Sequence, residues 1–158
     1  MAGLSLAALL GTRRHLPPAE ALKLLDQFIF NILVANTDAH AKNYSMLLGN
    51  EASVAPLYDV SSVLPWEHVN QYHAQKLAGR RRKPGDMARR HWDRIAEEVG
   101  LNGRNLRQRV QELVDLMIAK RVKAVAAVSA NQGAEAGMVE HVADLIEQNA
   151  LRIAGRLW

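Results

Sequence analysis

Apolar residues recur every three or four positions along most of the chain, and this spacing predicts a mainly α-helical fold. The first helix is expected over about residues 17–36, because Pro17 and Pro18 suit the first turn of a helix and an apolar stripe follows them. Three more helices are expected at about residues 88–99, 104–128 and 138–157. One face of the longest helix carries Leu106, Val110, Leu113, Leu116, Met117, Arg121 and Val125. The side chains expected to be buried along it are Leu106, Val110, Leu113 and Met117.

A polar stretch and two short apolar runs follow the first helix. Residues 37–45 carry no apolar stripe and are expected to form a loop. The apolar runs at 44–48 and 53–58 flank the turn-forming residues 49–51, a pattern typical of a small β-hairpin. Pro56 lacks a backbone donor, so it should occupy an edge position where no donor is needed.

Residues 66–85 give no clear pattern, and their arginine-rich end, 79–85, is expected to be a loop. The chain contains no internal repeat and no low-complexity tract. These features predict one mainly α domain over residues 1–158, with a small β-hairpin.

The composition is that of an ordinary globular domain, with 49% hydrophobic and 23% charged residues among 158. The chain has no cysteine, which excludes disulfides and thiolate metal sites. No apolar run approaches the roughly 20 residues that span a bilayer. Residues 1–10 are mildly apolar but lack a preceding charged segment, so no secretory signal is expected. A cytoplasmic protein with no membrane partner is therefore predicted.

Positive charge is concentrated in one part of the chain. The formal net charge is +4, which makes a nucleotide, a phosphoprotein or a nucleic acid a conceivable partner. Such clusters are also common on solvated faces and loops, so the charge alone leaves both interpretations open. The main cluster consists of Arg80, Arg81, Arg82, Lys83, Arg89, Arg90 and Arg94.

Three polar residues form the pattern with the most chemical content. Asp38 and Asn43 lie five positions apart in the polar loop, the interval between aspartate and asparagine in a kinase catalytic loop. Asp59 follows the second run of the predicted hairpin, where a second acidic residue could hold magnesium against phosphates. Oxygen ligands of this kind suit Mg²⁺. Capping or turn residues can share this spacing, so the interval alone does not decide between a structural and a catalytic role.

The sequence around these residues resembles the HipA family, bacterial Ser/Thr kinases that act as toxins of toxin–antitoxin pairs. The likeness is strongest over residues 25–62, which include the motifs at residues 30–45 and 55–60. It continues more weakly to the C-terminal residues. It is a likeness to the family's C-terminal catalytic lobe, and it implies a helical kinase-like lobe with a small β-hairpin next to the catalytic loop.

The resemblance assigns roles to individual residues and implies ATP and Mg²⁺ as ligands. Asp38 matches the catalytic aspartate, while Asn43 and Asp59 match the magnesium ligands. Ser45 is expected only to cap or pair locally. The positions that match the family's nucleotide-binding residues are His40, Lys42, Asn43, Tyr58 and Asp59.

Two departures from the family pattern limit what the chain is expected to do alone. The nucleotide-binding lobe that precedes this region in the family is absent from these residues, and no glycine-rich phosphate loop occurs in them. ATP binding is therefore expected to be weak without that lobe. After Ala78, an arginine-rich stretch at residues 79–85 replaces the family's apolar-and-lysine pattern, which puts any substrate contact there in doubt.

Three functional hypotheses remain at this point. The first is a kinase catalytic lobe with three partners: the missing lobe, a helix-turn-helix antitoxin and a protein substrate, with DNA reached only through the antitoxin. The second is a non-catalytic interaction module that keeps this fold and binds an antitoxin or DNA. The third, a generic helical nucleic-acid binder, is disfavoured because aromatic residues make up only 5% of the chain.

Overall fold

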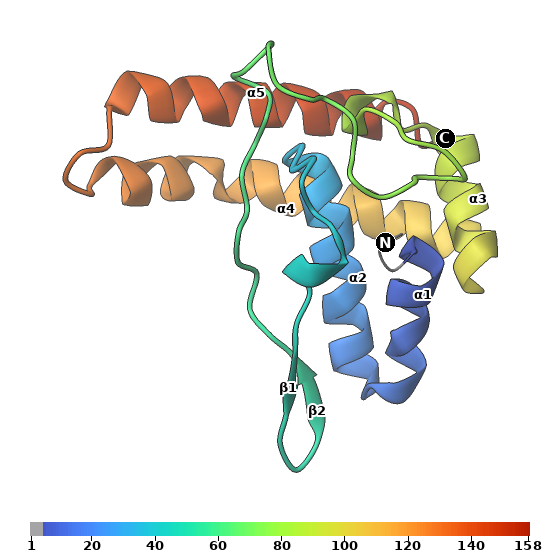
Figure 1. The fold of residues 1–158 in the computed structure, drawn as a ribbon. Coiled ribbons are helices and arrows are strands. Elements are labelled where there is room, and N and C mark those ends of the chain that lie inside the picture. Colours follow the sequence, from blue (N-terminus) through green and yellow to red (C-terminus); the bar gives the residue numbers. More distant parts are fainter. Residues whose placement is uncertain (1–4) are drawn as a thin grey trace.

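The computed structural model describes residues 5–158 as a mainly helical protein with one small hairpin, which confirms the predicted fold class (Figure 1). The expectation that the chain has no secretory signal rests on residues 1–10, and residues 1–4 of that stretch lie outside the described residues. No helix within residues 5–158 combines the length and the apolarity that crossing a membrane requires. The elements are α1 (Leu6–Gly11), α2 (Pro18–Leu33), β1 (Met46–Leu48), β2 (Ala52–Val54), α3 (Arg89–Val99), α4 (Gly103–Ser129) and α5 (Ala136–Ala154), with short 3-10 helices at Thr12–His15, Ala41–Asn43 and Pro84–Asp86.

The core lies where α2 meets α1, α3 and the adjacent halves of α4 and α5 (Figure 1). Phe28, Ile32 and Trp92 are among its largest fully buried side chains. The helix α1 was not predicted, because six residues are too few to show a helical period. Its leucines face the core and its first turn is capped, since the Ser5 hydroxyl accepts the N–H of Ala8.

Of the predicted helices, α3 ends as expected at Gly100, which takes the left-handed conformation typical of a helix C-terminus. The helix α2 ends three residues earlier than predicted. In α4, Leu106, Val110 and Leu113 are buried as expected. Met117 is only partly buried, although it packs against the core, and Leu116 beside it is 46% exposed.

The hairpin is shorter than the two apolar runs suggested. Its strands pair antiparallel, with Met46 opposite Val54. Pro56 lies beyond the end of β2 and outside the ladder, so its missing N–H costs no strand hydrogen bond. The chain then runs on without regular structure to Asp59.

The distal half of α4 and most of α5 form a helical arm that extends beyond the core (Figure 1). No residue from 115 to 148 is buried, in contrast to the first half of α4. Arg121 joins the two helices, pairing with Glu140 at 2.7 Å, with Glu147 at 2.9 Å and with Asp144. The arm is therefore held mainly by its own helix–helix contact and by these ion pairs.

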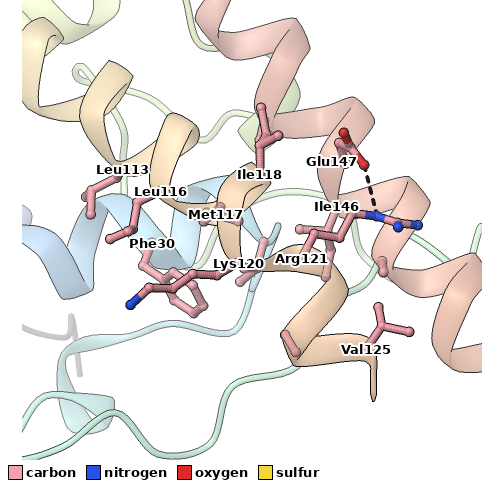
Figure 2. A pocket seen from close by; sticks show the side chains of 14 residues that line it. Phe30, Leu113, Leu116, Met117, Ile118, Lys120, Arg121, Val125, Ile146 and Glu147 are labelled. Atoms are coloured by element: carbon pink, nitrogen blue, oxygen red, sulfur yellow. Dashed lines mark ion pairs between the residues drawn. The ribbon is translucent and has the colours of Figure 1, made fainter. Parts of the chain in front are cut away.

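An apolar groove of about 360 Å³ lies where this arm joins α2. Phe30 from α2, Leu116 and Met117 from α4, and Ile146 from α5 contribute to its walls (Figure 2). Leu116 is exposed because it faces this groove and not the core.

Candidate active site

The candidate catalytic loop begins where α2 ends, and a left-handed residue sets its direction. Ala35 has a φ of 54°. Its N–H donates to the carbonyl of Ile32 at 3.1 Å, and the N–H of Asn36 donates to the carbonyl of Asn31 at 2.8 Å. These bonds form a Schellman motif, in which glycine is the usual left-handed residue. Alanine costs roughly 1–2 kcal/mol more there, and strained backbone of this kind is concentrated at functional sites.

A buried hydrogen-bond network fixes both ends of the loop. The Nδ2 of Asn36 donates to the Oδ1 of Asn31 at 2.9 Å and to the backbone oxygen of Asp59 at 3.2 Å. The Nδ2 of Asn31 donates to the Tyr44 hydroxyl at 3.1 Å. Burial raises the pKa of Tyr44 to about 12, so the hydroxyl stays neutral at physiological pH. The network therefore connects α2, the end of the loop and the segment that carries Asp59.

The side chains of Asn43 and Asp59 contact each other directly. Asn43 is only 5% exposed, and its Nδ2 donates to the Oδ2 of Asp59 at 2.6 Å. The Oδ1 of Asn43 accepts the backbone N–H of His40 at 3.1 Å, which leaves one of its two lone pairs free. Asp59 has a φ of 53°, a conformation that aspartate adopts more readily than most residues. The structure thus brings together the two residues that the resemblance assigns to magnesium.

Asp38 is exposed between two buried neighbours. Thr37 donates its hydroxyl to the carbonyl of Asn70 at 3.0 Å, and its own carbonyl accepts the N–H of Ala74 at 2.7 Å. Ala39 is fully buried. The backbone on both sides of Asp38 is therefore anchored while its carboxylate reaches solvent. That carboxylate takes part in no hydrogen bond or ion pair among the described residues, and so in none with Asn43 or Asp59.

The other predicted nucleotide-binding residues lie close to these groups in the chain. One of them, Tyr58, already forms hydrogen bonds with residues of the loop. The Tyr58 hydroxyl donates to the backbone carbonyl of Lys42 at 2.5 Å and lies 2.7 Å from the Ser45 hydroxyl. Ser45 therefore pairs locally, as expected. The Lys42 side chain is exposed, whereas His40 is half-buried and its Nδ1 has no hydrogen-bond partner within residues 5–158.

Residues 73–82 pack beside the catalytic loop, which their sequence pattern did not predict. Ala74 makes the backbone bond to Thr37 described above, and its neighbours His73 and Gln75 are buried. The segment shows neither a helical nor a strand period, so its local pattern does not distinguish it from an exposed loop.

The protein supplies few ligands for a metal ion. Within the described residues, no three histidine, aspartate or glutamate side chains gather at one point. Asn43 and Asp59 together offer a free amide lone pair and a carboxylate. This donor set fits Mg²⁺, which commonly takes one or two protein oxygens and completes its octahedron with water and phosphate.

Comparisons with known proteins identify the family of the chain and a shared fold. The family described as HipA-like C-terminal domain matches residues 3–123. A protein of Sinorhizobium fredii named "Putative kinase Y4mE" is 33% identical over 135 residues, which cover 85% of this chain and 32% of that protein.

Among solved structures, the HipA of Shewanella oneidensis, determined with HipB and operator DNA, superposes with a TM-score of 0.85. The match covers 98% of this chain and 37% of that chain at 22% identity, so it shows a shared fold. The chain thus spans about a third of the length of these two proteins. The family match extends over most of the residues, from before α1 to residue 123 near the end of α4, and the chain belongs to the family of HipA-like C-terminal domains.

Proposed function

We propose that this chain is the catalytic lobe of a HipA-like protein serine/threonine kinase, which transfers the γ-phosphate of ATP to a protein hydroxyl. The observation that carries the proposal is the 2.6 Å bond between Asn43 and Asp59, beside the loop that exposes Asp38. The family membership and the kinase name of the rhizobial relative support it.

In this proposal, the exposed Asp38 carboxylate orients the substrate hydroxyl and accepts its proton. Its exposure leaves room for a protein substrate to approach. Asn43 and Asp59 would hold Mg²⁺, which supplies charge neutralisation at the phosphates when bound. Asn36 and Tyr44 act at a distance from the reaction, because their buried hydrogen bonds keep the loop and the Asp59 backbone in register.

The proposed site is incomplete within these 158 residues. Kinases hold the phosphates with a covering loop and a lysine from another lobe, and phosphoryl transfer depends mostly on such positioning. We infer that a segment not included here supplies these groups, and that the chain alone binds Mg-ATP weakly. By analogy with the Shewanella HipA complex, we further infer a toxin–antitoxin role in the cytoplasm, with a helix-turn-helix antitoxin as partner and DNA reached only through it.

The experiment is transfer of labelled γ-phosphate from ATP to protein. The purified chain alone should show negligible transfer, and adding the phosphate-covering lobe of a full-length relative should restore it. Asp38→Asn should then lower the rate by about 10²-fold or more, the range for a positioned acid–base group. Asp115→Asn, at an exposed aspartate of α4, is the matched control and should leave the rate unchanged. Robust transfer by the chain alone would contradict the incomplete site.

A non-catalytic interaction module is the second candidate, and the open apolar groove between α2, α4 and α5 favours it (Figure 2). The proposed reaction has no use for this groove. Absence of transfer in the presence of the added lobe, combined with binding of the antitoxin, would select this candidate over the kinase.

A further inference from the structure

The arginine-rich segment after Ala78 forms a tight, hydrogen-bonded turn beside the catalytic loop. The N–H of Leu77 donates to the carbonyl of Arg80 at 2.9 Å, across Ala78 and Gly79, whose φ angles are 51° and 82°. Two consecutive positive φ angles are typical of a type I′ turn. The side chain of Arg82 reinforces this turn, donating to the carbonyl of Leu77 at 2.9 Å. The basic residues at the turn are therefore presented from a defined backbone.

A hollow of about 540 Å³ lies between this segment and the catalytic loop. Its lining includes His40 of the catalytic loop, together with Gln75, Lys76 and Arg81 of the segment that follows. The start of α1 and a glutamate of α3 also contribute. The hollow therefore includes a residue two positions from Asp38, the residue that would activate a substrate hydroxyl.

Two residues that line this hollow carry an enclosed polar atom without a partner among the described residues. They are Gln75, through its Oε1, and His40, through its Nδ1. A buried polar group without a partner costs roughly 1–3 kcal/mol. Because both atoms are enclosed, they mark a cost within the lining and are not contact points for a ligand.

The charge of the hollow is positive and uncompensated. Lys76 and Arg81 are exposed, and neither forms an ion pair with another described residue. Glu98 is the acidic residue of the lining, and Arg94 already pairs with it at 3.1 Å. An anionic ligand in the hollow would give Lys76 and Arg81 the counter-charges that the described residues do not supply.

We propose that this hollow binds an acidic segment of the protein substrate, next to the hydroxyl that Asp38 receives. Carboxylates of that segment pair with the exposed side chains of Lys76 and Arg81. A nucleic acid fits less well, since no phenylalanine, tyrosine or tryptophan within residues 5–158 lines the hollow for bases to stack on. The inference rests on the proposed kinase function, because it places the segment beside the transferred phosphate.

The test is peptide binding to the chain, measured by fluorescence anisotropy at low salt without nucleotide or magnesium. Three labelled decapeptides share a central serine and differ in having aspartate, alanine or lysine around it. The aspartate peptide should bind about tenfold more tightly than the alanine peptide, with the lysine peptide weakest. The double variant Lys76→Ala/Arg81→Ala should raise the Kd of the aspartate peptide by about fivefold or more.

The matched control is Lys120→Ala/Lys123→Ala, which removes two exposed positive charges from the distal half of α4 and should leave the Kd unchanged. Equal affinity for the three peptides, or wild-type affinity in the Lys76/Arg81 variant, would overturn the inference. A single-stranded 20-nucleotide DNA that binds more tightly than the aspartate peptide, and depends on the same two residues, would overturn it in favour of a nucleic acid.

This test can fail separately from the kinase proposal. Peptide binding that depends on Lys76 and Arg81, without phosphate transfer in the presence of the added lobe, would refute the reaction alone. Phosphate transfer without any preference for acidic peptides would refute the acidic-segment inference alone.

Discussion

Stability between pH 7 and pH 5 should depend strongly on His73, the buried histidine of the segment beside the catalytic loop. Its side chain is fully buried, and its Nδ1 accepts the N–H of Gln75 at 3.2 Å. Burial lowers the pKa of His73 from 6.5 to about 4, so the folded protein resists a proton that the unfolded chain accepts. The stabilisation is complete above pH 6.5 and is lost as the pH falls towards 4. From pH 7 to pH 5 the linkage removes about 2 kcal/mol.

Urea unfolding at pH 7, 6 and 5 measures this loss in the wild type and in His73→Asn. Asparagine does not titrate, and its side-chain oxygen can replace the Nδ1 as acceptor. The variant should therefore lose about 2 kcal/mol less than the wild type over the same interval. His141→Asn, at an exposed histidine of α5, should keep the wild-type profile. Equal losses in the wild type and in His73→Asn would show that another group carries the pH dependence and would refute the reasoning.

Two further predictions concern stability, measured by thermal and urea unfolding. Asn36→Ala should cost about 1–3 kcal/mol, because it leaves the buried Oδ1 of Asn31 without its donor, whereas Asn50→Ala at an exposed hairpin position should change stability by less than about 0.5 kcal/mol. An equal effect of the two changes would contradict the buried network. Gly79→Ala should cost about 1–2 kcal/mol, because its φ is 82° and the new Cβ would lie 2.8 Å from the Nη2 of Arg94. Gly137→Ala, with open space around it in the first turn of α5, should instead stabilise by about 0.5 kcal/mol, and a loss there would refute this comparison.

The hydrophobic pattern was sufficient to predict those helices and strands that bury an apolar face of their own. The helices α2 to α5 and the hairpin were all predicted, with boundaries wrong by a few residues. The early end of α2 depends on Ala35, whose left-handed conformation is set by the surrounding hydrogen bonds and not by its own preference. Leu116 shows a second limit of the hydrophobic pattern. Periodicity identifies the apolar face of a helix, but it does not show whether a neighbouring element covers all of that face.

The site was predictable only in part, for a related reason. The interval from Asp38 to Asn43 can be read from the chain, and the structure places Asn43 against Asp59. The contribution of residues 73–82 could not be read in this way, because it depends on a backbone bond between residues 37 apart in the chain. Asn31 carried an unused signal: an amide on the apolar stripe of α2 must find partners if it is buried.

The two halves of α4 differ in burial, and this difference should determine how each half unfolds locally. The buried residues of α4 end at Val114, and the rest of the helix is held by α5 and by the ion pairs of Arg121. Local unfolding free energies follow such differences in buried contact, so one continuous helix belongs to two cooperative units. We therefore expect amide hydrogens of the first half to exchange only when the core opens, and those of the distal half to exchange through fraying of the arm. The apolar groove lies at the boundary between these units, and a ligand bound there would slow exchange in the arm by joining it to the core.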